Sequence, residues 1–252
     1  MLCVGIIALL VVLVSIAVLL GSLPMRIVRE PDRERADDAD SIKAYNQVSR
    51  WPIFTLERHI LLKSLTKIKP KGYLIDVGCG PGYLAAQISL SYADLKVVGL
   101  DNSELTTKIA KSNWSSGFYN NLEFIIGDAQ RLPISNDSVD FVISSLSLHH
   151  WEDGQEAFRE IHRVLEPGGR FLIFDLRRDA PRYFYFALKI GQVFLAPRAI
   201  RNINGAIGSF WAAYKPSEIK TMLNSIPVEN LRIEPQLGWI LISGSKVRRP
   251  QS

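Results

Sequence analysis

The chain has 252 residues, of which 47% are hydrophobic and 22% charged, and its formal net charge is +5. These values exclude a disordered or low-complexity protein and allow one well-packed domain with an appendage. The mild positive charge comes without a long basic run or a basic stripe interleaved with aromatic residues, so no nucleic-acid partner is expected.

The first segment of the chain, from Leu2 to Leu23, contains no charged residue. About 22 residues at about 1.5 Å each give about 33 Å of helix, enough to cross a hydrocarbon core of about 30 Å. The sequence therefore predicts a transmembrane anchor over residues 1–24. A cleaved signal peptide is the alternative, but it would need a basic n-region, a shorter apolar core and a small-residue cleavage site.

A charged segment follows the apolar one. Four arginines come soon after it: Arg26, Arg29, Arg33 and Arg35. By the positive-inside rule they predict a single-pass membrane protein whose remaining chain faces the cytoplasm. Residues 25–40 are predicted to be a charged, solvated linker.

Two cysteines, Cys3 and Cys79, lie in contexts that are not expected to meet, and they leave no ligand set for a metal. This cysteine usage is typical of a reducing compartment.

Residues 41–252 alternate short β-rich runs with helical patterns, which predicts an α/β fold with a doubly wound, mostly parallel sheet. The seven expected strands are 73–77, 96–100, 122–126, 139–144, 170–175, 231–235 and 239–243. The expected helices are 53–67, 83–92, 103–113, 154–165 and 216–225. Only three residues separate the last two strands, which indicates a short reversal and an antiparallel last strand.

Residues 179–211 interrupt this alternation after the fifth strand. They are rich in aromatic and aliphatic residues and carry scattered arginines. One interpretation is a helical excursion whose aromatic residues join the core. The other is a lid over an apolar substrate, resting on a membrane surface.

The stretch "YLIDVGCGPGYLAAQ", residues 73–87, places Gly78, Gly80 and Gly82 between a strand and a helix. Glycines there let a ligand approach the helix N-terminus, although tight packing of helix on strand also needs glycine. A dinucleotide site usually has the spacing G-x-G-x-x-G, whereas this loop reads G-x-G-x-G after an acid, Asp76. The pattern therefore disfavours a pyrophosphate ligand.

Two more acids follow strands, Asp101 after the second and Asp128 after the third. A carboxylate at the position of Asp101 can bind both hydroxyls of a ribose, but it is equally well explained as a turn or N-cap acid. Because open α/β sheets bind ligands at the carboxyl ends of their strands, the three acids together predict a ligand site at that edge.

The motifs "DVGCGPG", "GLDNS", "GDAQRLPISNDSVDFVISS" and "VLEPGGRFLIFD" resemble those of class I S-adenosylmethionine-dependent methyltransferases, in the same order and spacing. The likeness is to the type 11 subgroup, which includes quinone-biosynthesis enzymes, and it covers residues 73–175. It implies a Rossmann-like methyltransferase fold and S-adenosylmethionine as cofactor. By this resemblance the cofactor-binding residues are Asp76, Gly78, Gly80 and Gly82 for the methionine part, Asp101 for the ribose, Asn102, Asp128 and Ala129 for the adenine, and Ser145 beside the cofactor.

His149 and His150 follow the fourth strand in "SLSLHHWED" and are candidate catalytic bases, because histidine titrates near the working pH. The alternative is that one caps the following helix and the other packs against Trp151. Tyr45 and Arg50 are weaker candidates for closing over the cofactor or substrate.

The apolar N-terminus and residues 179–211 together predict methyl transfer to a small, lipophilic acceptor at the cytoplasmic membrane face. Alternatives are a protein or other polar-substrate methyltransferase and a non-catalytic, cofactor-binding regulator. The signature N/D-P-P-Y/F does not appear after the fourth strand, which disfavours the amino groups of adenine and glutamine as acceptors.

Overall fold

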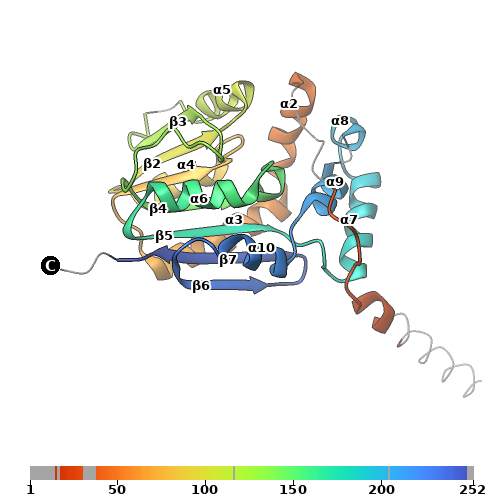
Figure 1. Ribbon diagram of the computed structural model, residues 1–252. Helices are drawn as coiled ribbons and strands as arrows, with labels where there is room; N and C mark the ends of the chain where they lie inside the picture. Colours follow the sequence, from red (N-terminus) through yellow and green to blue (C-terminus); the bar gives the residue numbers. More distant parts are fainter. Residues whose placement is uncertain (1–14, 16–17, 31–37, 116, 204, 249–252) are drawn as a thin grey trace, which may run out of the picture.

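The computed structural model describes residues 15, 18–30, 38–115, 117–203 and 205–248. Within them, the centre of the molecule is a seven-stranded sheet in the order β3-β2-β1-β4-β5-β7-β6 (Figure 1). The strands are β1 (Tyr73–Val77), β2 (Lys96–Asp101), β3 (Leu122–Ile126), β4 (Val139–Ser145), β5 (Leu165–Leu176), β6 (Val228–Pro235) and β7 (Trp239–Lys246). β1 to β5 pair in parallel, while β7 pairs antiparallel with both β5 and β6. The predicted sheet with a reversed last strand is confirmed.

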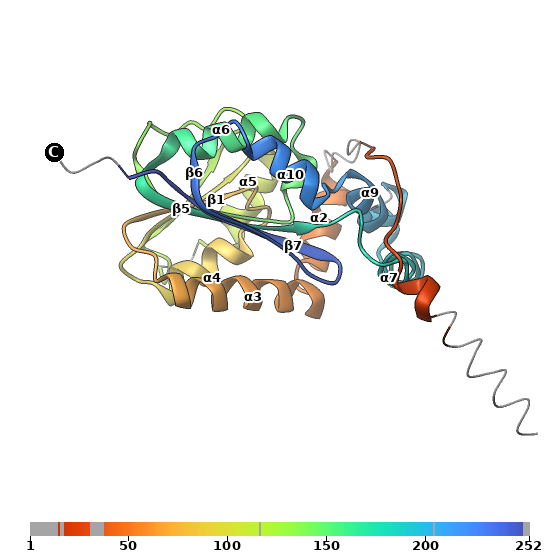
Figure 2. The same ribbon diagram turned by 60° about the horizontal axis from the view of Figure 1, so that its bottom comes forward.

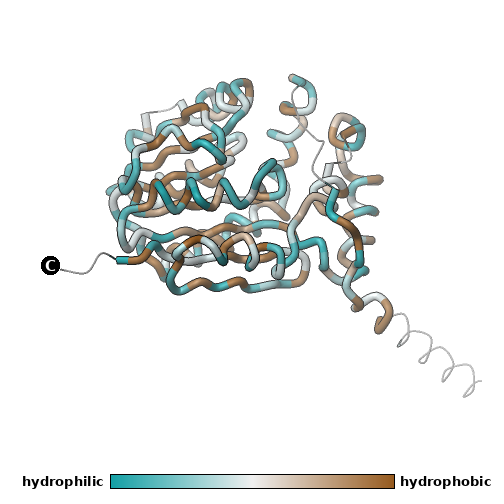
Figure 3. The backbone as a smooth tube through the Cα atoms, viewed as in Figure 1, coloured by the Kyte–Doolittle hydropathy of each residue, from teal (hydrophilic) through white to brown (hydrophobic). Residues whose placement is uncertain are grey.

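Helices cover both faces of this sheet (Figure 2). The helices next to the strands are α3 (Pro52–Ile68), α4 (Tyr83–Ser91), α5 (Glu104–Asn113), α6 (Gly154–Val164) and α10 (Pro216–Leu223). Apolar residues of α6 and α10 pack on one face, and those of α3 and α4 pack on the other. Because both faces are covered, the central strands are hydrophobic along nearly their whole length, shown in brown in Figure 3.

Four further helices and a 3-10 turn gather at one end of the sheet (Figure 1). They are α2 (Ala39–Val48), the 3-10 turn η1 (Leu148–His150), α7 (Arg182–Phe194), α8 (Arg198–Asn202) and α9 (Gly205–Ala212). α7 and α9 pack against each other, α9 also contacts η1, and α2 contacts α8. The interruption after β5 is therefore helical, and its helices stand beside the turn that carries the two candidate histidines.

The predicted transmembrane anchor over residues 1–24 is wrong as far as the described residues go, and so is the single-pass, cytoplasm-facing location built on it. No helix in that part of the chain is both long enough and apolar enough to cross a bilayer. The described helical turn ends at Ser22, and the chain then pairs with the domain, since Pro24 bridges Pro181. Residues 1–14 and 16–17 of the predicted anchor lie outside the described residues.

Residues 24–30, which we call the N-terminal strap, run along the segment between β5 and α10. The Met25 amide donates to the Ala180 carbonyl at 3.0 Å, and Arg29 Nε donates to the Ala212 carbonyl at 2.8 Å. Buried Arg178 donates from Nε to the strap carbonyl of Ile27 at 3.0 Å. These contacts attach the start of the described chain to the helices that follow β5.

Candidate functional site

The loop between β1 and α4 needs glycine at two positions for two physical reasons. Gly78 and Gly82 have φ values of 72° and 83°, a region that side chains rarely allow. A Cβ at Gly78 would lie 1.9 Å from Ser147 Oγ, and one at Gly82 would lie 2.5 Å from Phe124 Cζ. Close packing thus explains these two glycines even without a ligand.

Gly80 has more room around it. A Cβ there would meet only ordinary close contact, 3.4 Å from a ring carbon of Tyr45. Its amide donates to Asp101 Oδ2 at 2.9 Å, so the middle of the loop is fixed from β2. A ligand can therefore approach the loop backbone at this point.

Asp76, inside β1 and just before the loop, is 1% exposed. Among the described residues neither carboxylate oxygen has a hydrogen bond of acceptable distance and angle, although the nearby Ala85 amide slightly lowers the pKa. Burial, followed by the charges of Glu57 and Asp101, raises the pKa of Asp76 to about 8. A buried carboxyl without a partner is costly, and such groups are typical of sites that bind a ligand.

Asp101, at the end of β2, serves as a turn acid in this structure. Besides the Gly80 amide, it accepts from the Ser103 amide at 3.0 Å through Oδ1. Ser103, not Asp101, is the N-cap of α5. Burial raises the pKa of Asp101, and the two backbone hydrogen bonds counteract the rise.

Asn102, Asp128 and Ala129 follow the ends of β2 and β3. The Gly127 amide donates to the Asp101 carbonyl at 3.0 Å, which holds the two strand ends side by side. Asn102 and Asp128 are exposed, whereas Ala129 is buried. The predicted cofactor residues of the first three strands thus lie along one edge of the sheet.

Ser145, the last residue of β4, is hydrogen-bonded to Glu57, an acid that the sequence analysis did not predict as part of the site. Its hydroxyl donates to Glu57 Oε1 of α3. Glu57 is only 7% exposed, and burial raises its pKa to about 7 despite the Ser145 hydrogen bond and the nearby charge of Arg58. Glu57 lies four and eight residues before the fully buried Leu61 and Leu65, so an acid within the apolar stripe of a helix was the available signal.

Asp76, Ser145 and Glu57 line an open cleft whose empty space, including solvent at its mouth, is about 400 Å³. It lies between α2 and α3 on one side and the ends of β1 and β4 on the other. The polar and aromatic residues that line it are Tyr45, Ser49, Phe54, Glu57, Arg58, Asp76, Cys79, Tyr83 and Ser145.

The N-terminal helices are tied to the glycine loop by side chains. Arg50 Nε donates to Tyr83 Oη at 2.6 Å, and Tyr83 in turn donates to Asn46 Oδ1 at 3.0 Å. Burial, and then the negative charges of Asp101 and Glu57, raise the pKa of Tyr45 far above its usual range. The Tyr45 hydroxyl therefore stays protonated. Because Tyr45 lines the cleft, α2 forms one of its walls.

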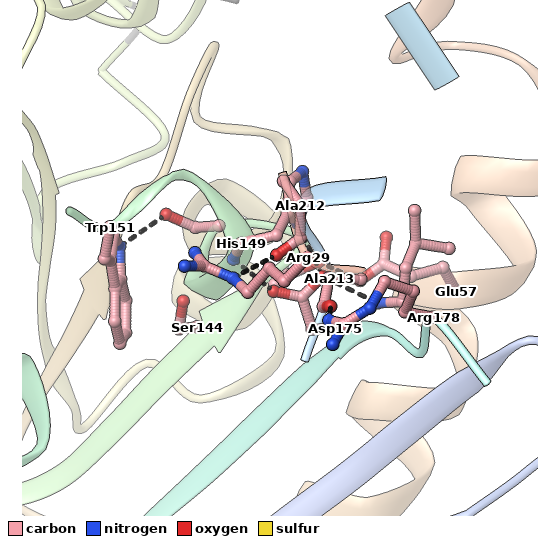
Figure 4. Close-up of polar contacts among 12 residues, drawn as sticks. Arg29, Glu57, Ser144, His149, Trp151, Asp175, Arg178, Ala212 and Ala213 are labelled. Carbon is pink, nitrogen blue, oxygen red and sulfur yellow. Dashed lines mark hydrogen bonds and ion pairs between the residues drawn. The ribbon is translucent and has the colours of Figure 1, made fainter. Parts of the chain in front are cut away.

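The two candidate histidines occupy different environments. His149 is buried, and its Nδ1 lies 2.6 Å from Asp175 Oδ1 of β5, while its main-chain amide donates to Asp175 Oδ2 at 2.9 Å (Figure 4). His150 is exposed, with its ring centroid 4.0 Å from that of His149. Neither caps α6, whose N-cap is Asp153.

The residues present fit S-adenosylmethionine at this edge. Asp76 supplies a buried carboxyl group beside the loop, Asp101 ends β2, and Asp128 follows β3. The space at Gly80 lets a ligand approach the backbone, as a cofactor with a cationic amino-acid end would require.

Comparison with known proteins agrees with this arrangement. The family described as methyltransferase domain matches residues 75–173. A demethylmenaquinone methyltransferase of Lactococcus lactis subsp. lactis (strain IL1403) is 32% identical over 140 residues, which are 55% of this chain and 53% of that protein. The chain spans about half the length of the curated relatives it matches.

Two solved structures share the fold. An S-adenosylmethionine-dependent methyltransferase from Aquifex aeolicus has a TM-score of 0.62 at 19% identity, covering 83% of this chain and 99% of that one. Phosphoethanolamine N-methyltransferase 2 of Haemonchus contortus, in complex with S-adenosylmethionine, has a TM-score of 0.64 at 16% identity, covering 85% of this chain and 59% of that one. At these identities the likeness concerns the fold alone.

Proposed function

Since residues 75–173 belong to the methyltransferase-domain family, we propose that the chain transfers the methyl group of S-adenosylmethionine to a small, lipophilic acceptor. The observation that carries this proposal is the edge of the sheet beside the glycine loop, where Asp76, Asp101 and Asp128 lie at the carboxyl ends of three adjacent strands. A polar or protein acceptor, and binding without turnover, are the alternatives that the experiment below distinguishes.

The cofactor, when bound, supplies an already activated sulfonium methyl group. The protein then has to bind and orient the acceptor and to exclude water. Proximity alone can lower the activation barrier of methyl transfer by about 7–11 kcal/mol. Asp76 and the glycine loop would hold the methionine part, and Asp101, Asn102 and Asp128 the adenosine part. The hydrogen bonds of Arg50 and Tyr83 keep α2 over this site.

His149 would serve as general base for an acceptor that must lose a proton. With Asp175 accepting from Nδ1–H, the imidazole carries its basic lone pair on Nε2. The second hydrogen bond, from the His149 amide to the same carboxylate, fixes the main chain of η1 as well. Asp175 is thus placed to orient the base and to stabilise the imidazolium that proton transfer creates.

The lipophilic nature of the acceptor is supported by the helices next to His149. None of the residues of α7 is buried, and several large apolar side chains on it are exposed: Tyr183, Phe186, Ile190, Val193 and Phe194. α9 contacts both α7 and η1, so this apolar segment is linked through α9 to the turn that carries the candidate base. We propose that residues 179–211 act as the lid over the acceptor.

Transfer of a labelled methyl group from S-adenosylmethionine tests the function. We expect the purified chain to label an apolar component of a native lipid extract, and Asp101→Ala to reduce the rate at least about tenfold through weaker cofactor binding. Asp94→Ala, at an exposed acid in the preceding turn, is the matched control and should label at the normal rate.

Label found only in soluble polar acceptors or proteins would contradict the lipophilic acceptor. Binding of the cofactor with no label in any fraction would instead favour the non-catalytic regulator.

A further inference from the structure

α7 presents an apolar stripe to solvent. Large exposed side chains recur along it every three or four residues, from Tyr183 through Phe186 and Ile190 to Phe194, so they share one face of the helix. Phe194 is 76% exposed. A helix at the surface of a globular domain ordinarily shows polar residues to water, and a contiguous apolar patch marks a surface that binds a partner.

The opposite face of α7 is held by the domain. Phe184 contacts the rings of Phe210 and Trp239, and Gln192 Oε1 accepts from the Ile207 amide at 2.8 Å. The helix cannot turn its stripe inward without losing these contacts, so the stripe stays on the outside.

The apolar residues before the N-terminal strap extend this surface. Leu19 and Leu20 are exposed, and the helical turn that carries them stands next to the start of α7 in Figures 1 and 2. A Cβ at Gly21 would lie 3.8 Å from Tyr183 Cβ, so the two segments touch. We call the exposed apolar side chains of residues 18–23 and of α7 the apolar face.

The segment that carries α7 and α8 has basic residues and no acidic ones. The sequence contains no aspartate or glutamate between Asp179 and Glu218, whereas α7 and α8 contain four basic residues: Arg182, Lys189, Arg198 and Arg201. Apolar side chains edged by arginine and lysine fit the surface of a bilayer, where the apolar groups enter the acyl boundary and the cations meet anionic headgroups.

A second copy of the chain fits the apolar face less well. A two-fold contact would place the same patch of each copy opposite itself, so Arg182 and Lys189 of both copies would come together. Like charges brought together oppose association. Anionic lipid offers opposite charge and an apolar layer at once.

We propose that the apolar face is a docking site for the surface of an anionic lipid bilayer. The chain rests on the interface and does not cross it, because the 13 residues of α7 span about 20 Å, short of a hydrocarbon core of about 30 Å. The docking itself does not depend on the proposed function. Together with that function it supplies a route, since α9 contacts both α7 and η1 and a lipophilic acceptor then enters from the bilayer toward His149.

Co-sedimentation of the full chain with lipid vesicles tests the docking. One set of vesicles is phosphatidylcholine alone, and the other is an equal mixture of phosphatidylcholine and phosphatidylglycerol. We expect at least about tenfold tighter binding to the anionic vesicles. High salt should remove most of this difference, because it screens the headgroup charge.

Phe194→Glu and Phe118→Glu form a matched pair, because both replace an exposed phenylalanine and change the net charge equally. Phe194 belongs to the apolar face, whereas Phe118 lies between α5 and β3, at the far edge of the sheet. We expect Phe194→Glu to weaken binding to anionic vesicles at least about tenfold, and Phe118→Glu less than about twofold.

Lys189→Gln tests the contribution of the cations. We expect it to weaken binding to anionic vesicles about fivefold and to leave binding to phosphatidylcholine within about twofold. Lys111→Gln, at an exposed lysine of α5, is the control and should bind both kinds of vesicle as the wild type does.

The outcomes separate this inference from the proposed function. Equal vesicle binding by the two phenylalanine variants, or no sedimentation of the wild type with anionic vesicles, would overturn the docking. A dimer in vesicle-free solution that Phe194→Glu dissociates, without vesicle binding, would assign the apolar face to a second copy and overturn it as well. Binding of S-adenosylmethionine, measured without vesicles, should be the same in all four variants, so failure of the docking would leave the methyltransferase standing.

Discussion

At the scale of single residues, the buried contact between His149 and Asp175 sets the strictest geometry near the proposed site. Asp175 accepts from His149 Nδ1, from the His149 amide and from the Leu176 amide, all between 2.6 and 2.9 Å. Three donors on one buried carboxylate leave the imidazole little freedom to turn. Its neighbour His150 is exposed.

We expect His149→Gln to lower kcat at least about a hundredfold, because glutamine can donate to Asp175 but has no basic nitrogen. The dissociation constant of S-adenosylhomocysteine should stay within about threefold. His150→Gln is the matched control, and its exposed side chain should allow a near-normal kcat. Turnover and calorimetry on the same preparations check both values, and a His149→Gln enzyme with normal kcat would rule out the base.

The residues that the sequence could reveal are those whose role depends on their own strand or loop. An apolar pattern locates the strands whose carboxyl ends carry Asp76, Asp101 and Asp128. Parallel pairing brings the carboxyl ends of these strands to one edge of the sheet. Glu57 stood out only as an acid in the apolar stripe of its helix, and Asp175 only as the last residue of the expected strand 170–175, so neither signal named the partner of the side chain. Their roles arise because α3 and β5 meet β4 and η1 from elsewhere in the chain, and no local spacing records that meeting.

At the scale of elements, α7 is the least packed of the described helices around the site. Phe184 contacts Phe210 and Trp239 with ring centroids 6.4 Å apart in each pair, and Tyr185 contacts Phe210 at 5.3 Å. Phe184 also fills the space over Gly238, where a Cβ would lie 2.0 Å from its ring. Phe186, two residues on, is 54% exposed.

The two phenylalanines form a natural comparison. We expect Phe184→Ala to lower the free energy of unfolding by about 2 kcal/mol, since it removes a partly buried ring. Phe186→Ala should change it by less than about 0.5 kcal/mol and, if the lid is correct, raise KM for the acceptor instead. Urea unfolding and acceptor kinetics measure the two effects, and equal losses of stability would show that α7 is packed on both sides.

Helices and strands were predictable where the hydrophobic periodicity and the turn residues indicated the same boundaries. The expected strands 73–77 and 122–126 coincide with β1 and β3, and β6 and β7 form the expected reversal. The apolar N-terminal stretch led to the wrong prediction of a transmembrane anchor, because length and hydropathy do not determine where a helix ends. Pro24 and Met25 pair with residues 180–181, which lie far away in sequence.

At the scale of the whole molecule, the raised pKa values of Glu57 and Asp76 link stability to pH in the direction opposite to most acids. The ordinary values are 4.5 and 3.8, and the folded values are about 7 and about 8. Between these limits the folded state binds more protons than the unfolded state. The contribution of the pair is therefore full at low pH and is lost as pH rises toward 8.

Other acids act in the usual direction. Arg163 lowers the pKa of Glu160 by a hydrogen bond, so the stability from that pair is present above the ordinary pKa and is lost as pH falls. The measured dependence of the free energy of unfolding on pH is the sum of these two opposite contributions. Comparison with a variant is needed to isolate the contribution of the carboxyl groups in the cleft to the pH dependence of stability.

We expect Glu57→Gln to flatten the fall in the free energy of unfolding of the ligand-free protein between pH 4.5 and 7. A shift of about 2.5 pKa units corresponds to about 3.5 kcal/mol at most, since each unit is about 1.4 kcal/mol. Urea unfolding at several pH values measures this difference, and Glu234→Gln, at an exposed acid of β6, should follow the wild type. Parallel curves for wild type and Glu57→Gln would show that the pKa of Glu57 is the same in the folded and unfolded states.

The N-terminal strap has a consequence for the order in which the molecule is made. Arg29 and its partner Ala212 are 183 residues apart in sequence, and Ile27 and Arg178 are 151 apart. Such long-range contacts close late in folding. Because synthesis runs from the N-terminus, the strap leaves the ribosome long before α9 exists, and its backbone groups must remain available until the last third of the chain emerges.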